Sequence, residues 1–244
     1  MNNMNVIEIK NVSRTFPDGK TALNDVSFCV ARGEFVVICG RNGSGKSVLM
    51  SLIAGLDEPT AGTIEVPQNG VGLVFQDADA QILGETPEED VAFGLRSMGV
   101  NRSECSARAQ DVLRRVGLYE KRRLPARQMS GGEKRRLSVA GILAMNRDIF
   151  IFDEPFANLD FPGVQQVCEI LASLKRDGKT VLVLTHELEK ILSLADRFII
   201  LDNGKIEFNG VPQDGLRQNL EAFGIRNPLA RYERVNDLFW GRAE

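Results

Sequence analysis

The sequence predicts an α/β fold, and three features indicate it. Apolar, largely β-branched runs at residues 34–39, 148–153 and 180–185 have the character of strands that are buried on both faces. Segments with helical spacing lie between these runs. A glycine-rich loop joins the first run to the helix that follows it. A chain of 244 residues is long enough for one α/β domain with an inserted subdomain, or for two small domains.

Composition narrows the class of protein. The 30 Lys and Arg residues and 33 Asp and Glu residues are interspersed and give a net charge of −3, so nothing favours nucleic acid or anionic lipid as the main partner. The four cysteines lie far apart without metal-ligand spacing, which suits a reducing cytosol. No apolar run approaches the roughly 20 residues that span a bilayer. We therefore expect a protein that neither crosses a membrane nor is exported.

The chain opens with the pattern of an antiparallel sheet. Residues 4–10 alternate between apolar and polar side chains, residues 16–19 form a turn, and residues 21–30 resume strand character. Residues 62–66 are expected to join this sheet. Phe16 lies at the turn, where it is either a core residue or an aromatic platform for a ligand.

A phosphate-binding loop follows at residues 40–47, which match the pattern G-x-x-x-x-G-K-[ST] in full and are flanked by a strand and a helix. Gly40, Gly43 and Gly45 permit the backbone to turn its N–H groups toward an anion, and the helix N-terminus favours negative charge at the same place. Lys46 is expected to reach the β- and γ-phosphates of a nucleotide, and Ser47 to bind Mg²⁺. The alternative is an accidental glycine turn.

The middle of the chain combines another strand with charged helices. Residues 71–76 form an apolar strand that ends in Gln76. The Gln76 amide is either an edge group whose hydrogen bonds are made within the protein or, in a protein with a phosphate loop, a group that binds Mg²⁺ or orients water. Residues 87–98 and 103–117 have helical spacing.

A second helix N-terminus could hold an anion. Ser130 is expected to be the N-cap of a helix that runs from 134 to 145. Gly131 and Gly132 bring backbone amides to the same end. The arrangement is either a plain cap or, because two exposed glycines are a costly way to cap a helix, a contact for an anion.

Two adjacent carboxylates end the buried strand at residues 148–153. Successive strand residues point to opposite sides, so Asp153 and Glu154 suit different tasks. Asp153 suits the Mg²⁺ complex, and Glu154 suits the base that polarises a water toward the γ-phosphate. The alternative is a solvated strand end. His186, the only histidine, follows the strand at 180–185, at the edge where ligands of open α/β folds bind.

The chain then has the pattern of a hairpin and a tail. Asn203-Gly204 separates residues 197–202 from residues 205–208 and predicts a type I′ turn. From about Pro212 the chain is polar and helical in places, and residues 231–240 have amphipathic character.

These motifs, in this order, resemble those of the ATP-binding cassette (ABC) ATPases over nearly the whole chain up to about residue 212. The residues that carry the resemblance stand at the family's adenine-stacking aromatic, Walker A motif, glutamine loop, signature, Walker B motif, following loop and switch histidine. They are Phe16, Gly40 to Ser47, Gln76, Ser130 to Gly132, Asp153 and Glu154, Leu159 and Asp160, and His186. Two places depart from the pattern: Met129-Ser-Gly-Gly-Glu133 replaces Leu-Ser-Gly-Gly-Gln, and Ala157-Asn158 replaces Ser-Ala.

The resemblance implies a P-loop NTPase (RecA-like) core with an antiparallel β subdomain and an inserted α-helical subdomain. The nucleotide-binding domain would cover residues 1–212, with antiparallel parts at about 4–35 and 60–70 and the helical subdomain at about 87–146. Residues 213–244 would form a short C-terminal tail.

The resemblance also implies that the chain uses ATP and Mg²⁺. Glu154, His186 and Gln76 would be catalytic, and Ser47, Gln76 and Asp153 would bind the metal. The residues that would contact ATP are Phe16, Gly40, Asn42, Gly43, Ser44, Gly45, Lys46, Ser47, Val48, Ser130, Gly131 and Gly132. In the family, two cassettes enclose two ATP molecules, and the signature of one meets the phosphate held by the other. A homodimer of this chain would have every motif.

A narrower resemblance is to the ATPase subunits of energy-coupling-factor importers, which take up vitamins such as biotin and the metals cobalt and nickel. Residues 74–83, 88–94, 134–136 and 140–145 carry it. It implies a transmembrane subunit that docks on residues 77–98, a solute-binding membrane subunit, a second copy or a related cassette, and a peripheral place on the cytoplasmic face of the membrane. It implies no nucleic acid as partner.

Other classes remain as alternatives. An ATPase of another ABC importer or exporter has the same motifs. A soluble cassette ATPase of translation would carry two cassettes, and one of DNA maintenance would insert a long coiled coil, whereas about 83 residues separate Ser47 from Ser130 here. A nucleotide-dependent scaffold without turnover would not need Glu154 and His186.

Overall fold

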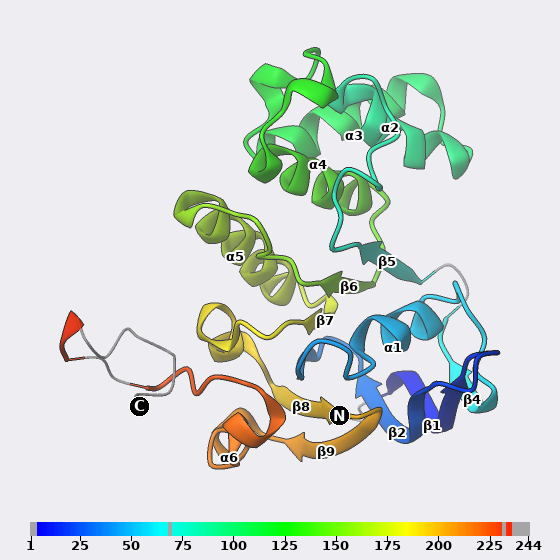
Figure 1. The fold of residues 1–244 in the computed structure, drawn as a ribbon. Coiled ribbons are helices and arrows are strands. Elements are labelled where there is room, and N and C mark those ends of the chain that lie inside the picture. Colours follow the sequence, from blue (N-terminus) through cyan, green and yellow to red (C-terminus); the bar gives the residue numbers. More distant parts are fainter. Residues whose placement is uncertain (1–3, 68–69, 231–232, 236–244) are drawn as a thin grey trace.

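The computed structural model describes residues 4–67, 70–230 and 233–235, and its core is a six-stranded sheet (Figure 1). The strand order is β5-β6-β7-β3-β8-β9, and all neighbouring strands are parallel except β8 and β9. The strands are β3 (Phe35–Cys39), β5 (Val71–Val74), β6 (Ile149–Asp153), β7 (Thr180–Leu184), β8 (Arg197–Asp202) and β9 (Lys205–Gly210).

Helices cover both faces of this sheet. Every residue of β3, β6 and β7 is buried, as the uninterrupted apolar runs predict. Helix α1 (Lys46–Ile53) packs on one face, together with the smaller sheet, and α5 (Phe161–Arg176) packs on the other. The predicted α/β fold is confirmed. Because the parallel strands end at one edge, the loops after β3, β6 and β7 come together there.

The predicted antiparallel sheet is also present, in the order β2-β1-β4. Its strands are β1 (Asn5–Thr15), β2 (Thr21–Ala31) and β4 (Ala61–Glu65). Strand β1 runs five residues past the expected end at Lys10. Alternation fails there because Asn11 takes a positive φ of 51° and the register with β2 shifts between Ile9 and Val12.

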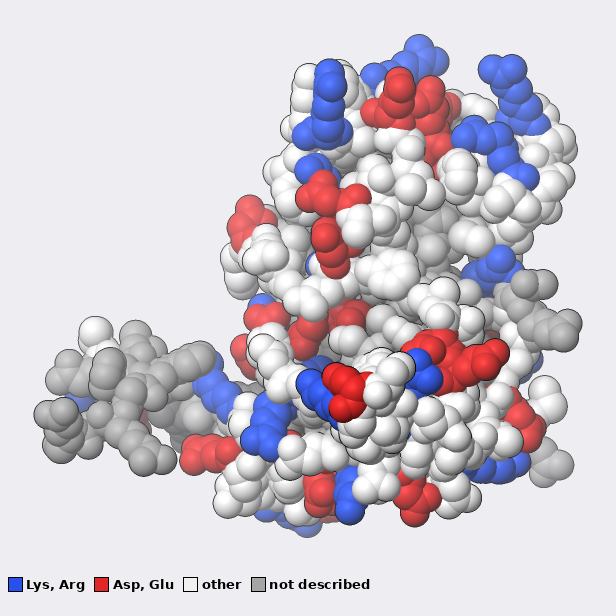
Figure 2. All heavy atoms as spheres, turned by 45° about the vertical axis from the view of Figure 1, so that its right-hand side comes forward, with Lys and Arg blue, Asp and Glu red and all other residues white. Residues whose placement is uncertain are grey.

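Three helices form a separate lobe, at the top of Figure 1. They are α2 (Pro87–Ser97), α3 (Arg102–Arg115) and α4 (Gly131–Ala144), with N-caps Thr86, Asn101 and Ser130. Helix α4 begins three residues before the expected position, because the Ser130 cap takes both glycines into the first turn. The basic residues 121–123, which follow α3, are largely paired: Lys121 bonds Glu133, and Arg122 stacks on Tyr119. Figure 2 shows acidic side chains beside basic ones over most of one face.

Residues 203–225 form a hairpin turn and then contribute to the core. Asn203 and Gly204 both have positive φ, 46° and 75°, as the predicted type I′ turn requires. After helix α6 (Pro212–Gly215), Leu220 and Ile225 are buried in the main apolar cluster. The sequence predicted a polar segment from about Pro212, whereas part of residues 212–225 is buried in the apolar core. The amphipathic stretch 231–240 lies outside the described residues, except for 233–235.

The described residues also include short 3₁₀ turns at Tyr119–Lys121, Ala126–Gln128, Leu188–Lys190, Leu192–Leu194 and Leu220–Phe223. Within the described residues, no helix is long and apolar enough to cross a bilayer.

Candidate functional site

The phosphate loop lies between β3 and α1, and tight packing requires two of its glycines. A Cβ on Gly40 would lie 2.1 Å from the carbonyl oxygen of Leu201. Gly45 has φ +106°, and its Cβ would lie 2.6 Å from the carbonyl oxygen of Ala22. Gly43 also has positive φ, but open space surrounds it. The sequence prediction ascribed all three glycines to the approach of an anion, whereas Gly40 and Gly45 are also required by contacts with β8 and β2.

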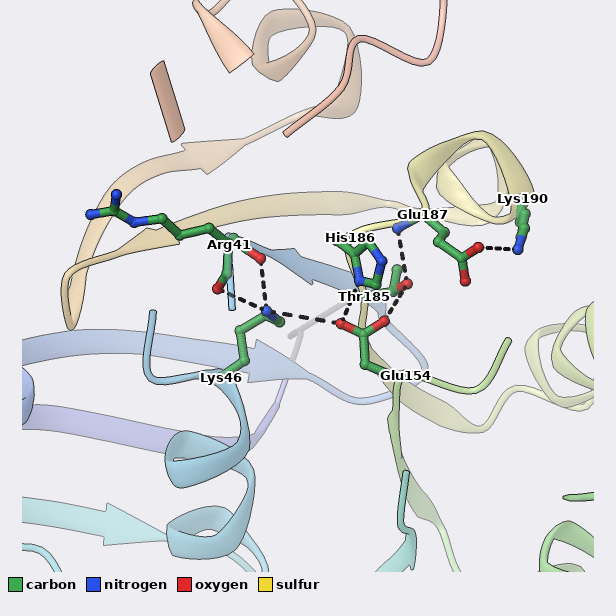
Figure 3. A network of polar contacts seen from close by, with 8 residues as sticks. Arg41, Lys46, Glu154, Thr185, His186, Glu187 and Lys190 are labelled. Carbon is green, nitrogen blue, oxygen red and sulfur yellow. Dashed lines mark hydrogen bonds and ion pairs between the residues drawn. The ribbon is translucent and has the colours of Figure 1, made fainter. Parts of the chain in front are cut away.

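Lys46 is a nearly buried cation at the first position of α1. Its side chain is 6% exposed, and Nζ donates to the carbonyl oxygens of Gly40 at 2.7 Å and Arg41 at 3.3 Å (Figure 3). The N-cap Gly45 offers no side-chain acceptor, and the first turn contains no acidic residue. The N–H groups of this helix end therefore have no side-chain cap, and together with the ammonium they suit an anion.

Glu154 occupies a buried and conformationally unusual position after β6. Its φ of 43° is rare for a residue with a Cβ. Thr185 Oγ1 donates to Oε2 at 3.0 Å, and His186 Nδ1 lies 2.9 Å from Oε1. Lys46 Nζ is 3.9 Å from the same Oε1. Both carboxylate oxygens are thus held in place by the two residues that follow β7, which orients the group toward the phosphate loop (Figure 3).

Asp153 is a buried carboxylate that lacks a full set of partners. Its Oδ1 atom makes no hydrogen bond within the described part of the chain. Burial raises the pKa of Asp153, and the nearby Glu154 charge adds to this, while a hydrogen bond from Ser47 and the cations Lys46 and Arg135 lower it. A buried carboxylate oxygen without a donor is suited to a cation.

These groups surround one cleft of about 410 Å³. The predicted residues that line it are Phe16, Asn42, Gly43, Gly45, Lys46, Ser47, Val48, Gln76, Asp153, Glu154 and His186. Gly40 and Ser44 are buried and do not line it. The fold therefore brings together most of the residues that the motifs identify, from five separate segments, although their roles in ATP binding and hydrolysis stay predictions.

Some residues of the cleft were missed by the sequence reasoning. Lys20, Thr21 and Ala22 line it from the start of β2. Thr185 directly follows the buried strand β7, and nothing in the sequence marks its contact with Glu154. The sequence held one signal for this part of the cleft, because the basic residue Lys20 lies directly after the predicted turn and four residues after Phe16.

The cleft fits a nucleotide with Mg²⁺. Ser47, Gln76 and Asp153 line it and carry a hydroxyl, an amide oxygen and a carboxylate, which are the oxygen ligands that Mg²⁺ prefers. The ring of Phe16 also lines the cleft, and the Arg14 guanidinium lies 5.2 Å from its centroid. We expect the aromatic face toward the cleft to be the surface available for a base.

Ser130, Gly131 and Gly132 do not line this cleft. Ser130 is the N-cap of α4, as predicted, and forms a reciprocal capping box with Glu133. Its hydroxyl accepts from the Glu133 N–H, which leaves the O–H able to donate to an anion. A Cβ on Gly131 would meet nothing closer than 3.9 Å, so the N-terminus of α4 is open. The predicted anion contact at this end stays a prediction.

Comparison with known proteins gives consistent results. The family profile described as ABC transporter matches residues 23–157. The energy-coupling factor transporter ATP-binding protein EcfA1 of Lacticaseibacillus paracasei is 39% identical over 248 residues, which cover 96% of this chain and 88% of that protein.

Two solved structures are also similar. The first is cbiO1 from Clostridium perfringens, part of the ABC transporter complex cbiONQ. It shares 28% sequence identity, with a TM-score of 0.79, over 88% of this chain and 91% of that one. The second is the ATP-binding cassette MJ0796, a dimer in a post-hydrolysis state bound to ADP and Pi. It shares 30% identity, with a TM-score of 0.77, over 84% of this chain and 98% of that one.

Proposed function

The chain belongs to the ABC transporter family of ATPases, and we propose that it powers an importer of the energy-coupling-factor type. The solute would be a vitamin such as biotin or a transition metal ion such as cobalt or nickel. Relatives named as energy-coupling factor subunits, 34–39% identical, support this type over other ABC importers or exporters. The observation that carries the hydrolytic part is the buried Glu154, held by Thr185 and His186 beside Lys46.

Each side chain of the cleft has a proposed task in hydrolysis. Lys46 and the amides of the loop would bind the phosphates, and Ser47, Gln76 and Asp153 would hold Mg²⁺. The metal would neutralise charge that develops on the phosphoryl group. Glu154 would accept a proton from the attacking water. His186, which contacts Oε1 of Glu154 and lines the cleft, would help to orient this water.

A second cassette would complete the site. Ser130, Gly131 and Gly132 lie outside the cleft of their own chain, at an open helix end that can face another molecule. We propose that this end meets the γ-phosphate of a partner copy or a related cassette. In this arrangement residues 1–212 form the nucleotide-binding domain, with residues 213–244 as its tail.

A docking surface for the transmembrane subunit is proposed at residues 77–98. This segment exposes Leu83 (67% exposed), Phe93 and Met98, which are unusual for a surface that faces only water. A neighbouring cavity of about 400 Å³ is lined by Gly84 to Thr86, Pro125 and Arg127. These features suit a helix with an apolar face. They would place the chain on the cytoplasmic face of the membrane, as a peripheral subunit beside a separate solute-binding subunit.

The hydrolytic part is tested with Glu154→Gln, which keeps the shape of the side chain but cannot accept a proton. A positioned general base contributes about 10²–10⁴-fold in rate, and hydrolysis should fall by that order while ATP binding survives. With Mg·ATP the variant should accumulate as a closed dimer, visible by size-exclusion chromatography. Glu187→Gln is the matched control, because Glu187 pairs with Lys190 and does not line the cleft. Hydrolysis by Glu154→Gln at the wild-type rate would exclude Glu154 as the base.

The docking surface is tested by the charge reversal Glu89→Lys, on the exposed side of α2. We expect this variant to reduce uptake by cells and the yield of membrane complex, while nucleotide binding by the isolated chain is unchanged. Glu120→Lys makes the same change in the same lobe, outside residues 77–98, and should leave uptake intact. Normal complex yield and uptake with Glu89→Lys would contradict the assignment.

A further inference from the structure

A buried cation on α4, the helix that begins at the signature, contacts the backbone beside the proposed nucleotide cleft. Arg135, in the second turn of α4, is only 3% exposed. Its guanidinium donates to two consecutive backbone carbonyls, from Nη1 to Phe75 and from Nη2 to Gln76. These residues follow directly after β5. One side chain thus joins the helix that begins at the signature to the backbone of the glutamine that lines the cleft.

Other contacts of α4 hold the same loop. Lys134 pairs with Asp79 at 2.5 Å, and Ser138 Oγ donates to the carbonyl of Ala78 at 3.5 Å. These two contacts involve a solvent-exposed carboxylate and a long hydrogen bond, so each contributes little. Arg135 is the buried contact, with charge-assisted bonds, and it therefore dominates the attachment.

The strand that carries this loop is itself tightly placed. β5 is the edge strand of the large sheet, and the Gln81 side chain completes its outer edge, accepting from Phe75 N at 3.1 Å and donating to Leu73 O at 3.0 Å. β5 also lies directly against α4, where a Cβ on Gly72 would come within 2.4 Å of Ile142 Cγ2 (Figure 1). Because β5 and α4 are closely packed, a displacement of Gln76 is expected to be transmitted to α4.

Gln76 lines two cavities next to its contact with Arg135. It lines the nucleotide cleft, and it lines a second cavity of about 390 Å³ that includes Gly131, Lys134, Arg135 and Asn158. Asp153 and Asp77 are the acidic groups whose charges act on Arg135. The cation is thus near a proposed Mg²⁺ ligand on one side and the open end of α4 on the other.

We propose that Arg135 is a positioning residue that makes Gln76 and the segment Ser130 to Gly132 move together. This inference rests on the proposed function, in which the signature serves the ATP site of a second cassette. Contact between Gln76 and bound Mg·ATP displaces the backbone that Arg135 holds. The displacement moves the N-terminus of α4. ATP in one site thereby sets the position of the signature that is offered to the other site.

The direct test is hydrogen exchange measured by mass spectrometry, with Mg²⁺ and the non-hydrolysable analogue AMP-PNP. In the wild-type protein, the analogue should change exchange in peptides that cover both residues 74–79 and residues 128–134. Arg135→Met keeps the apolar stem but removes the donors, so only the first segment should respond. Arg135→Lys restores one donor group and should recover part of the second response. Arg115→Met is the control, since it removes a half-exposed cation of the same lobe.

The exchange is measured at two protein concentrations. A response passed within one chain is independent of concentration, whereas protection by a second copy is lost on dilution. A wild-type response at 128–134 that vanishes on dilution would overturn the proposal, as would an undiminished response in Arg135→Met. This readout needs no hydrolysis. A wild-type chain that binds AMP-PNP but never hydrolyses ATP would refute the proposed function and leave the test of Arg135 valid.

Turnover supplies the second readout. Residues that transmit coupling typically change it by an amount that corresponds to about 2- to 30-fold, so the turnover rate of Arg135→Met should fall within that range and the Hill coefficient for ATP should approach one. Its affinity for a fluorescent ATP analogue should stay within about twofold of wild type. Equal loss of binding and turnover would indicate general unfolding of the site and would contradict a positioning role.

Discussion

At the scale of single residues, the cleft keeps opposite charges in surroundings with little water. Lys46 and Asp153 are both nearly buried, and Glu154, next to Asp153 in sequence, has its Oε1 3.9 Å from Lys46 Nζ. Buried charges are costly unless they are paired, so each is expected to gain from a ligand of opposite charge. Lys46 is matched to phosphate and Asp153 to Mg²⁺, which gives the two residues separate and testable roles.

Lys46→Ala should lose ATP binding as well as hydrolysis. Hydrogen bonds to charged groups contribute about 1.5–3 kcal/mol, which corresponds to roughly 10- to 100-fold in affinity. Titration with a fluorescent ATP analogue measures this loss. Lys20→Ala, at an exposed residue that also lines the cleft, should have a smaller effect because solvent screens its charge. Affinity of Lys46→Ala close to wild type would contradict the assigned phosphate site.

Asp153→Asn should make the ligand-free protein more stable near neutral pH. Burial raises the pKa of Asp153 above 3.8, so the folded state binds the proton more tightly than the unfolded state. The free energy of unfolding therefore falls as pH rises from about 3.8 through the raised pKa, and the penalty is complete above it. Asparagine removes this penalty.

The measurement is thermal unfolding in EDTA at several pH values. The advantage of Asp153→Asn should be present at pH 7 and shrink toward pH 4. In separate samples without EDTA, Mg·ATP should raise the melting temperature of the wild-type protein more than that of the variant. A variant that is less stable at every pH would show that the carboxylate is already satisfied in the fold.

At the scale of elements, helix α2 holds Leu83 and Gly84 of the proposed docking surface through the side chain of Asp90. The Asp90 carboxylate accepts from the N–H groups of Leu83 at 2.7 Å and Gly84 at 2.9 Å. Burial raises the pKa of Asp90, and these two bonds lower it in part. Gly84 packs so closely that a Cβ would lie 2.3 Å from Asp90 N. The exposed side chain of Leu83 is therefore presented from a fixed backbone.

Asp90→Ala should destabilise the protein by about 1–3 kcal/mol, because two N–H groups, one of them partly buried, lose their acceptor. Asp90→Asn keeps one oxygen acceptor and should lose less. Urea unfolding measures the difference, and limited proteolysis near residues 83–84 should be faster in the alanine variant. Wild-type stability of Asp90→Ala would mean that water replaces the carboxylate at no cost.

At the scale of the whole molecule, the large sheet separates two apolar clusters. One contains α1 and the small sheet, and the other contains α5, the helical lobe and part of the C-terminal segment. Leu220 and Ile225 belong to the second cluster. Gly224, with φ +66°, turns the chain beside Arg41 of the phosphate loop, whose guanidinium pairs with Asp202. Residues 220–225 therefore pack against the domain that forms the nucleotide cleft.

Ile225→Ala should lower the free energy of unfolding by about 2–5 kcal/mol, the usual cost of removing a buried isoleucine side chain. Leu229→Ala, four residues later at a position that is 69% exposed, should change it by less than about 0.5 kcal/mol. Chemical unfolding of both variants checks the prediction. Equal effects would indicate that the segment does not pack as a part of the core.

Sequence by itself determined what short-range patterns encode. The phosphate loop needs only residues 40–47, the N-cap of α4 needs only Ser130 and Glu133, and the buried strands need only an uninterrupted apolar run. The type I′ turn at Asn203-Gly204 is likewise local, because it depends on two adjacent backbone conformations.

Only the tertiary structure decided which distant groups meet. Thr185 reaches Glu154 across 31 positions and Arg135 reaches Phe75 across 60, and neither residue type marks such a contact in sequence. Ile225 is buried because this segment returns to the main apolar cluster, which its local sequence does not indicate. Ser130 is kept out of the Lys46 cleft by the placement of a whole lobe. Local patterns arise from backbone geometry within a few residues, whereas these contacts depend on the packing of complete elements.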